Sequence, residues 1–122
     1  MQVNKLSKKT LLSKVDAIRF QIVTHCFINK IPVSDADVNC ITLLAVNKGI
    51  ELHTMCNKAC ELKIFKTPQS VRNAINKIEK KKLIVKEGKN KKKLALSKDM
   101  NIVTEGNILL DYNFLSVEAN KS

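Results

Sequence analysis

Apolar residues recur at helical spacing through the middle of the chain. The stretch 35–47 is apolar almost all round, which predicts a buried helix, and Ser34 before it is a good N-cap. A second helix is expected within 50–65, and a third over 68–82, where Thr67 is the N-cap and a proline occupies the first position. The inward stripe of the second helix is expected to hold Leu52, Met55, Cys56, Ala59 and Leu62. The inward stripe of the third helix is expected to hold Val71, Ala74, Ile75 and Ile78.

After the third helix the pattern changes to the alternation typical of strands. Composition predicts a strand over 83–87, a turn at 88–90 and a returning strand over 91–96, so the two strands form a hairpin. The stretch 14–29 fits both a helix and a strand pattern, and we favour a helix for its first half. Further β-like pieces are expected between 100 and 117, the longest of which alternates Ile108, Leu110, Tyr112 and Phe114 on one face.

Length and composition exclude several classes of protein. The chain has 122 residues with only three Gly and two Pro, which excludes collagen-like, linker-like and glycine-loop nucleotide-binding chains. No apolar run approaches the ~20 residues needed to span a bilayer, and the N-terminus lacks the apolar stretch of a signal peptide. We therefore expect an intracellular protein, in a bacterial or host cytoplasm, with an α+β fold in one domain. It would comprise a basic arm over 1–13, the folded domain over 14–98 and a C-terminal β extension over 99–122.

The positive charge is concentrated in one part of the chain. The net charge is +11, and the stretch 77–98 holds ten lysines against two glutamates, which makes it +8 by itself. Such a patch indicates a polyanionic partner, of which nucleic acid is the commonest. An anionic membrane, an acidic protein surface and a solvated face kept for solubility are the alternatives. A membrane ranks below nucleic acid because no apolar face is interleaved with the lysines.

The order of helix, helix, short turn, helix and basic hairpin resembles that of winged helix-turn-helix DNA-binding proteins. Residues 51–98, ELHTMCNKACELKIFKTPQSVRNAINKIEKKKLIVKEGKNKKKLALSK, are similar to the second and third helices and the wing of that family. Within them, TPQSVRNAINKIEKKKLI resembles the recognition helix and the strand after it. The resemblance implies a winged-helix domain over 14–98 that binds double-stranded DNA and is not an enzyme, and the helix 35–47 would be its first helix.

Side chains suited to nucleic acid cluster in this part of the chain. At 100° per residue, Gln69, Asn73 and Asn76 share the face of the third helix opposite its core stripe, and amides can bond adenine in the major groove. Exposed amides are also ordinary on helix surfaces, so the helix 68–82 carries this interpretation only together with the lysines of the hairpin 83–96. With only two arginines, the chain would hold the DNA backbone more than read bases. The candidate nucleic-acid-binding residues are Gln69, Arg72, Asn73, Asn76, Lys77, Lys80, Lys81, Lys86, Lys89, Lys91, Lys92 and Lys93.

A second resemblance points to a different role. The Lys/Asn/Ile-rich composition and the segments TPQSVRNAINKIEKKKLIVKEGKNKKK and TEGNILLDYNFL are similar to small conserved proteins of crAss-like phages. Some of these are virion parts, so this resemblance implies a structural protein of the neck, ring or head that uses the winged-helix fold as a packing module. Its residues 1–14 and 105–118 would then contact virion proteins or further copies of the chain, with the apolar C-terminal strand adding to a neighbour's sheet.

Metal binding and catalysis find little support in the residue pattern. His53, Cys56 and Cys60 fall on one side of a helix, and Cys40 or His25 could add a fourth zinc ligand, but Cys56 belongs to the inward stripe. We interpret the four cysteines as reduced thiols packed like small hydrophobic residues. No cofactor is expected, because no phosphate-binding glycine loop and no carboxylate pair at acid–base spacing occurs.

Overall fold

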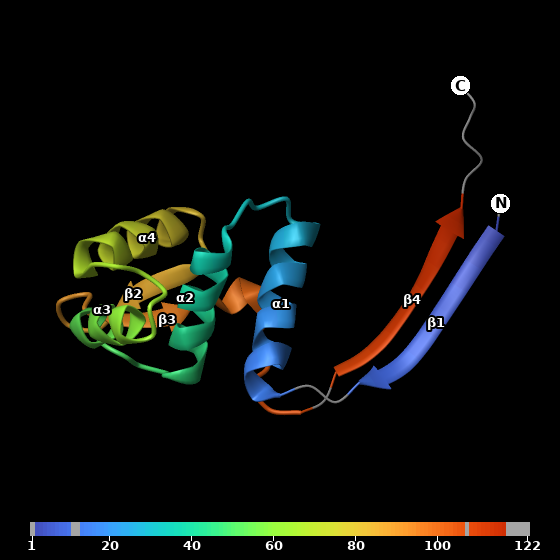
Figure 1. Ribbon diagram of the computed structural model, residues 1–122, viewed down its shortest axis with the longest axis horizontal. Helices are drawn as coiled ribbons and strands as arrows, with labels where there is room; N and C mark the ends of the chain where they lie inside the picture. Colours follow the sequence, from blue (N-terminus) through green and yellow to red (C-terminus); the bar gives the residue numbers. More distant parts are fainter. Residues whose placement is uncertain (1, 11–12, 107, 117–122) are drawn as a thin grey trace, which may run out of the picture.

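The computed structural model describes residues 2–10, 13–106 and 108–116 and shows an α+β chain (Figure 1). Four helices are followed by a small antiparallel hairpin, as the sequence predicts, and a second, longer pair of strands joins the two ends of the chain. The order is compatible with a winged-helix-like layout. The elements are β1 (Gln2–Thr10), α1 (Lys14–Ile28), α2 (Asp35–Val46), α3 (Leu52–Glu61), α4 (Pro68–Lys80), β2 (Ile84–Glu87), β3 (Lys93–Leu96), the short 3₁₀-helix η1 (Lys98–Met100) and β4 (Ile108–Ser116).

The helix boundaries follow from their caps. The Ser34 hydroxyl accepts from the Asp37 amide, and the Asp37 carboxylate accepts from the Ser34 amide, which together form a capping box at the start of α2. Thr67 caps α4 in the predicted way. That helix ends at Lys80 rather than at the predicted Lys82, because Lys82 adopts a left-handed φ of 63° and turns the chain toward β2.

Helix α2 is the centre of the helical body. It packs against α1, α3, α4 and β3, and Figure 1 shows it between α1 on one side and α3 and α4 on the other. Its near-continuous apolar surface is what this position requires. The core comprises Ile18, Ile22 and Cys26 of α1, Val38, Cys40, Ile41, Leu44 and Ala45 of α2, and Ile50, Met55, Cys56, Ala59, Val71, Ile75, Ile78, Leu83, Ile84, Leu94 and Met100 from the chain that follows.

Two sequence expectations about the helices are corrected. Leu62 is 61% exposed, whereas the inward stripe of α3 was expected to include it; the helix ends at Glu61, so the chain leaves the helical path before Leu62 can reach the core. The α1 segment is helical over its whole length, beyond the first half that its pattern favoured. Its buried face, Ile18, Ile22 and Cys26, keeps strict i, i+4, i+8 spacing.

The hairpin is tied to the start of α3. Glu51 forms a β-bridge with Lys93, the Leu52 amide donates to the Lys92 carbonyl (2.7 Å), and the Leu94 amide donates to the Ile50 carbonyl (2.9 Å). The backbone just before α3 therefore acts as a third, short edge of the small sheet. This anchoring holds the hairpin against the α3–α4 unit rather than leaving it a free two-stranded loop.

The two ends of the chain form a ribbon. Strand β1 pairs antiparallel with β4 along its full length, with Gln2 opposite Ser116 and Thr10 opposite Ile108, and Figure 1 shows the ribbon standing away from the helices. The sequence predicted a basic arm and a separate β extension; the structure pairs them with each other. One edge of β4 is thus occupied by β1 instead of being open to a neighbour's sheet. Residues 1, 11–12, 107 and 117–118 of the predicted contact segments lie outside the described residues.

The segment between the hairpin and β4 is held along α1. The Gln21 side-chain Nε2 atom donates to the Val103 carbonyl, and the Val103 backbone amide donates to the Gln21 Oε1 atom, both at 2.7 Å. Lys14 pairs with Glu105 at 3.3 Å nearby. Within the described ranges, no helix is both long and apolar enough to cross a lipid bilayer.

Candidate nucleic-acid interface

The polar face of α4 carries the three predicted amides. Gln69, Asn73 and Asn76 are all exposed, while the opposite stripe of the helix lies in the core. The Gln69 Nε2 atom donates to Asn73 Oδ1 at 3.0 Å. This bond occupies one acceptor and one of two amide hydrogens, so both side chains keep donors and acceptors for an outside partner.

Lys86 joins this face to the hairpin. Its Nζ atom donates to Asn76 Oδ1 at 2.8 Å and lies 3.5 Å from Glu79 Oε1, so a β2 side chain bridges to two successive turns of α4. The Lys86 side chain is only 22% exposed. Lys86 therefore fixes the helix and the hairpin to one another, and its charge is partly neutralised by Glu79.

Two further predicted lysines have partners within the protein. Lys77 Nζ lies 3.1 Å from Asp37 Oδ2, and this carboxylate is 2% exposed whereas the lysine side chain is 53% exposed. Lys81 donates to the Pro32 carbonyl in the α1–α2 connection. Both lysines bind α4 to the N-terminal side of α2, which leaves them less available to a phosphate than the lysines of the hairpin.

A group of exposed lysines lies at the end of the hairpin. Its loop spans residues 88–92, between the paired Glu87 and Lys93, and begins with a glycine at a left-handed φ of 90°. None of its lysines belongs to an ion pair between residues that the structure describes. The exposed lysines here are Lys89, Lys91, Lys92 and Lys93.

The remaining two predicted residues differ from each other. Lys80 is exposed in the last turn of α4, where a cation is favoured by the helix dipole. Arg72 is half-buried, and its charge opposes the rise of the Cys56 pKa, so it lies on the α3 side of α4 rather than beside Asn73. Arg72 is thus a helix-packing residue as much as a surface cation.

The cysteines are free thiols, as expected. Cys26, Cys40 and Cys56 are buried, and Cys60 is half-buried. Burial raises the pKa of Cys40 to about 12, helped by the nearby Asp37 carboxylate, and burial also raises the pKa values of Cys26 and Cys56. These three thiols are therefore protonated and poorly nucleophilic near neutral pH.

The metal set weighed from the sequence does not assemble. His53 is exposed and lies 3.4 Å from Asn57, whereas Cys56 points into the core. Across residues 13–106 and the described part of the terminal ribbon, no three His, Cys, Asp or Glu side chains are grouped as metal ligands.

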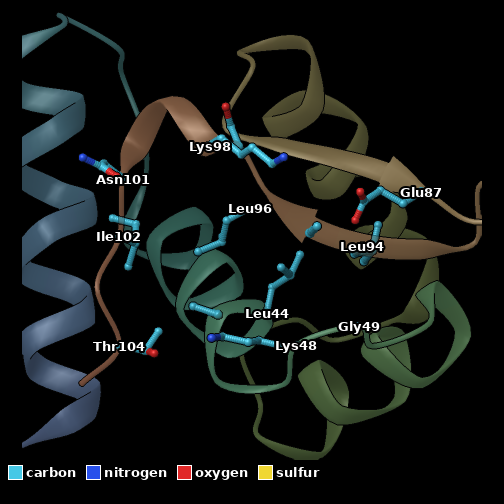
Figure 2. A pocket seen from close by; sticks show the side chains of 13 residues that line it. Leu44, Lys48, Gly49, Glu87, Leu94, Leu96, Lys98, Asn101, Ile102 and Thr104 are labelled. Carbon is cyan, nitrogen blue, oxygen red and sulfur yellow. The ribbon is translucent and has the colours of Figure 1, made fainter.

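A depression beside the hairpin is lined by residues of α2, of the two hairpin strands and of the segment after β3. Figure 2 shows Leu44, Leu94 and Leu96 from α2 and β3 on one side of it, and Ile102 and Thr104 on the other. Its volume is about 660 Å³. Its charged lining residues are Lys48, Glu87 and Lys98, and none of the predicted nucleic-acid-binding residues lines it. The depression therefore borders the hairpin strands but includes none of the candidate residues.

Sequence reasoning missed the acidic partners of this surface. Asp37 and Glu79 each pair with a lysine, Lys77 or Lys86, that the sequence assigned to nucleic-acid binding. Asp37 had a visible signal, since a serine followed by an acidic residue three positions later indicates a capping box. Its pairing with Lys77 had none, because the two residues are far apart in the chain and meet only when α4 packs on α2.

Comparison with known proteins adds no constraint. No protein family, curated protein or solved structure shows significant similarity to this chain. The candidate surface is an amide-bearing helix face joined through Lys86 to a lysine-rich hairpin.

Proposed function

We propose that the protein is a non-enzymatic, double-stranded DNA-binding protein of the winged helix-turn-helix type. Helix α3, the turn at 62–67 and helix α4 would be the helix-turn-helix, and the β2–β3 hairpin the wing. The observation that carries the proposal is the 2.8 Å hydrogen bond from Lys86 to Asn76, which makes the helix face and the hairpin parts of one surface.

The dimensions of α4 suit a major groove. Thirteen residues at 1.5 Å each make a helix about 20 Å long, and B-DNA's major groove, about 12 Å wide, admits one α-helix. With its core stripe packed on the body, α4 can present only its polar side, where Gln69 and Asn73 lie. Amides in that position can bond adenine edges, while the scarcity of arginine leaves guanine contacts few.

The hairpin would supply backbone contacts. Its exposed loop lysines would neutralise phosphates beside the groove that α4 occupies, and each such contact releases condensed counterions. Lys86, Lys77 and Lys81 would instead support the surface from behind, because each is already held by an oxygen of the protein. Because only the loop lysines would contact phosphates, we expect them to dominate the salt dependence of binding.

The test is fluorescence anisotropy of a labelled duplex over a series of salt concentrations. Replacing Lys91, Lys92 and Lys93 together by Gln should reduce the slope of log K against log salt by up to about 2.7, because each phosphate that a lysine neutralises adds roughly 0.9 to that slope. The matched control is a triple Gln variant of Lys14, Lys30 and Lys48. These three lysines are exposed and belong to neither α4 nor the hairpin, so their replacement removes the same charge from outside the proposed surface.

Two outcomes would contradict the proposal. The wild-type protein could bind with no salt dependence, or both triple variants could lose the same amount of affinity. The second result would mean that net charge, rather than the α4–hairpin surface, attracts the duplex.

A structural role in a phage particle is the second candidate, favoured by the β1–β4 ribbon. A two-stranded ribbon is only marginally stable alone, so a ribbon standing away from the body suits a partner that packs against it. Mass spectrometry of purified particles tests this role directly. Recovery of the protein in stoichiometric amounts would support the virion role, and its absence from particles would eliminate it.

A further inference from the structure

Strand β3 has a free edge at Leu96. The Ser97 amide donates to the Leu83 carbonyl at 2.9 Å, and Leu96 lies opposite Ile84 in the register of the hairpin. In an antiparallel pair with this bonding, the backbone amide and carbonyl of Leu96 point away from β2. Across the described ranges, neither group has a hydrogen-bond partner. This edge therefore offers one unused donor and one unused acceptor.

The edge is open because the chain turns away from it. Glu51 lies opposite Lys93 in an antiparallel bridge, so the same register would bring Lys48 opposite Leu96. A left-handed φ of 76° at Gly49 instead bends the chain between the end of α2 and this bridge. The place of a strand beside Leu96 is thus left unfilled, and the depression lies there.

Backbone with unused polar groups also lines the opposite side of the depression. Figure 2 shows Ile102 and Thr104 there, across from Leu96. Both backbone groups of Val103, between them, are bound to the Gln21 side chain on α1. The amides and carbonyls of Ile102 and Thr104 have no hydrogen-bond partner among the residues that the structure describes. The depression thus lies between two stretches of backbone that can still accept and donate hydrogen bonds.

The side chains of the depression indicate what would fill it. Leu96 and Ile102 are half-buried and supply aliphatic surface. Lys48 and Lys98 are exposed, and among the described residues neither belongs to an ion pair. Glu87 is the remaining charged lining residue, so the lining carries one positive charge in excess. A ligand with backbone-like donors and acceptors, an aliphatic side chain and a carboxylate is complementary to this lining.

We propose that the depression binds a short, extended segment of an acidic partner protein, which adds to β3 at Leu96 as a further strand. The backbone of the segment would accept from the Leu96 amide and donate to its carbonyl, as in other cases of strand addition. An aliphatic side chain would lie between Leu96 and Ile102, and a carboxylate would lie toward Lys48. This inference does not depend on DNA binding, because none of the candidate nucleic-acid-binding residues lines the depression.

Fluorescence anisotropy with the full-length protein, in the absence of DNA, tests the site. The probe is a fluorescein-labelled hexapeptide of alternating valine and glutamate, whose valines share one side when the peptide is extended. We expect the wild type to bind it saturably. Lys48→Gln should weaken binding about threefold, the scale of one exposed ion pair. The matched control, Lys30→Gln, removes an exposed lysine outside the depression and should bind like the wild type.

The role of the peptide backbone is tested separately, because a protein of net charge +11 attracts acidic peptides in general. Two further probes of the same charge carry methyl groups on the backbone nitrogens of all the valines or of all the glutamates. Alternate residues of a strand direct their amides to opposite neighbours, so one of these sets faces β3. At least one methylated probe should bind 10-fold or more weakly than the unmethylated peptide, roughly the effect of losing its backbone hydrogen bonds. Hydrogen exchange followed by NMR should show slower exchange of the Leu96 amide when the unmethylated probe is bound.

Several results would overturn the proposal. Equal binding of all three probes, or equal losses in Lys48→Gln and Lys30→Gln, would mean that net charge alone attracts the peptide. An absence of binding, or binding that leaves exchange of the Leu96 amide unchanged, would overturn it as well. Both altered lysines are exposed, so circular dichroism should show wild-type melting temperatures for both variants.

Discussion

The contact between Asp37 and Lys77 makes a sharp test of how α4 is held on α2. Asp37 is 2% exposed, and its Oδ2 atom accepts from the Ser34 amide at 3.2 Å and lies 3.1 Å from Lys77 Nζ. One carboxylate thus completes a capping box and ties two helices together. Replacing Asp37 with Ala removes both functions, while Lys77, which is 53% exposed, stays solvated.

The expected loss of stability follows from these interactions. Removal of the capping interaction costs about 1 kcal/mol, and removal of an ion pair with a half-exposed lysine costs up to about 1 kcal/mol. We expect Asp37→Ala to lower the free energy of unfolding by about 2 kcal/mol, and Lys77→Met to lower it by about 1 kcal/mol because the cap remains. The double variant should cost little more than Asp37→Ala alone, since the two single variants remove the same ion pair.

Urea unfolding followed by circular dichroism measures these values. With a typical dependence of about 1–3 kcal/mol per molar urea, Asp37→Ala should move the midpoint down by about 1 M. A loss below about 0.5 kcal/mol would refute the contribution of Asp37 to the capping box and to the ion pair. Fully additive losses in the double variant would refute the coupling between Asp37 and Lys77, and with it the view that this pair secures α4.

Three further predictions concern the backbone and the thiols. Gly49 has a φ of 76° with open space around its Cα, so Gly49→Ala should destabilise the fold by about 1 kcal/mol through backbone strain alone, measured by urea unfolding. Under native conditions a thiol reagent should modify half-buried Cys60 first, and the buried Cys26 and Cys56 should react only on unfolding; rapid modification of all of them would contradict their placement. The Cys40 pKa rises from 9.0 to about 12 on folding, so above pH 9 the unfolded chain loses this proton while the folded chain retains it, and stability should fall as pH rises. Cys40→Ala should lose less stability between pH 9 and pH 10 than the wild type, by up to about 1.4 kcal/mol.

The local structure of the domain could be predicted because it depends on neighbouring residues. The caps at Ser34 and Thr67 and the apolar stripe of α4 are short-range signals, and each produced the expected helix. The hairpin followed from composition and its turn. The sequence predicts the ends of helices less accurately than their presence. Its apolar spacing continues the stripe of α3 to Leu62, but the helix ends at Glu61 and Leu62 is exposed.

The candidate site was only partly visible in the sequence. Helical periodicity placed Gln69 and Asn73 on the outer face of α4, where the structure has them. Periodicity treats every lysine in and after α4 alike, because it carries no information about side chains on other elements. The structure separates them, since Lys86 bonds to α4 and Lys77 to α2, while the loop lysines extend into solvent.

What the sequence determined by itself was the α+β class, the three central helices, the hairpin and the concentration of charge between residues 77 and 98. Each of these depends on spacing or composition over a few turns of chain. Only the tertiary structure decided that β1 pairs with β4, that Asp37 meets Lys77, and that the chain before α3 pairs with β3. These features join residues that are distant in the chain, and such contacts are selected by the packing of the whole molecule, which no local pattern encodes.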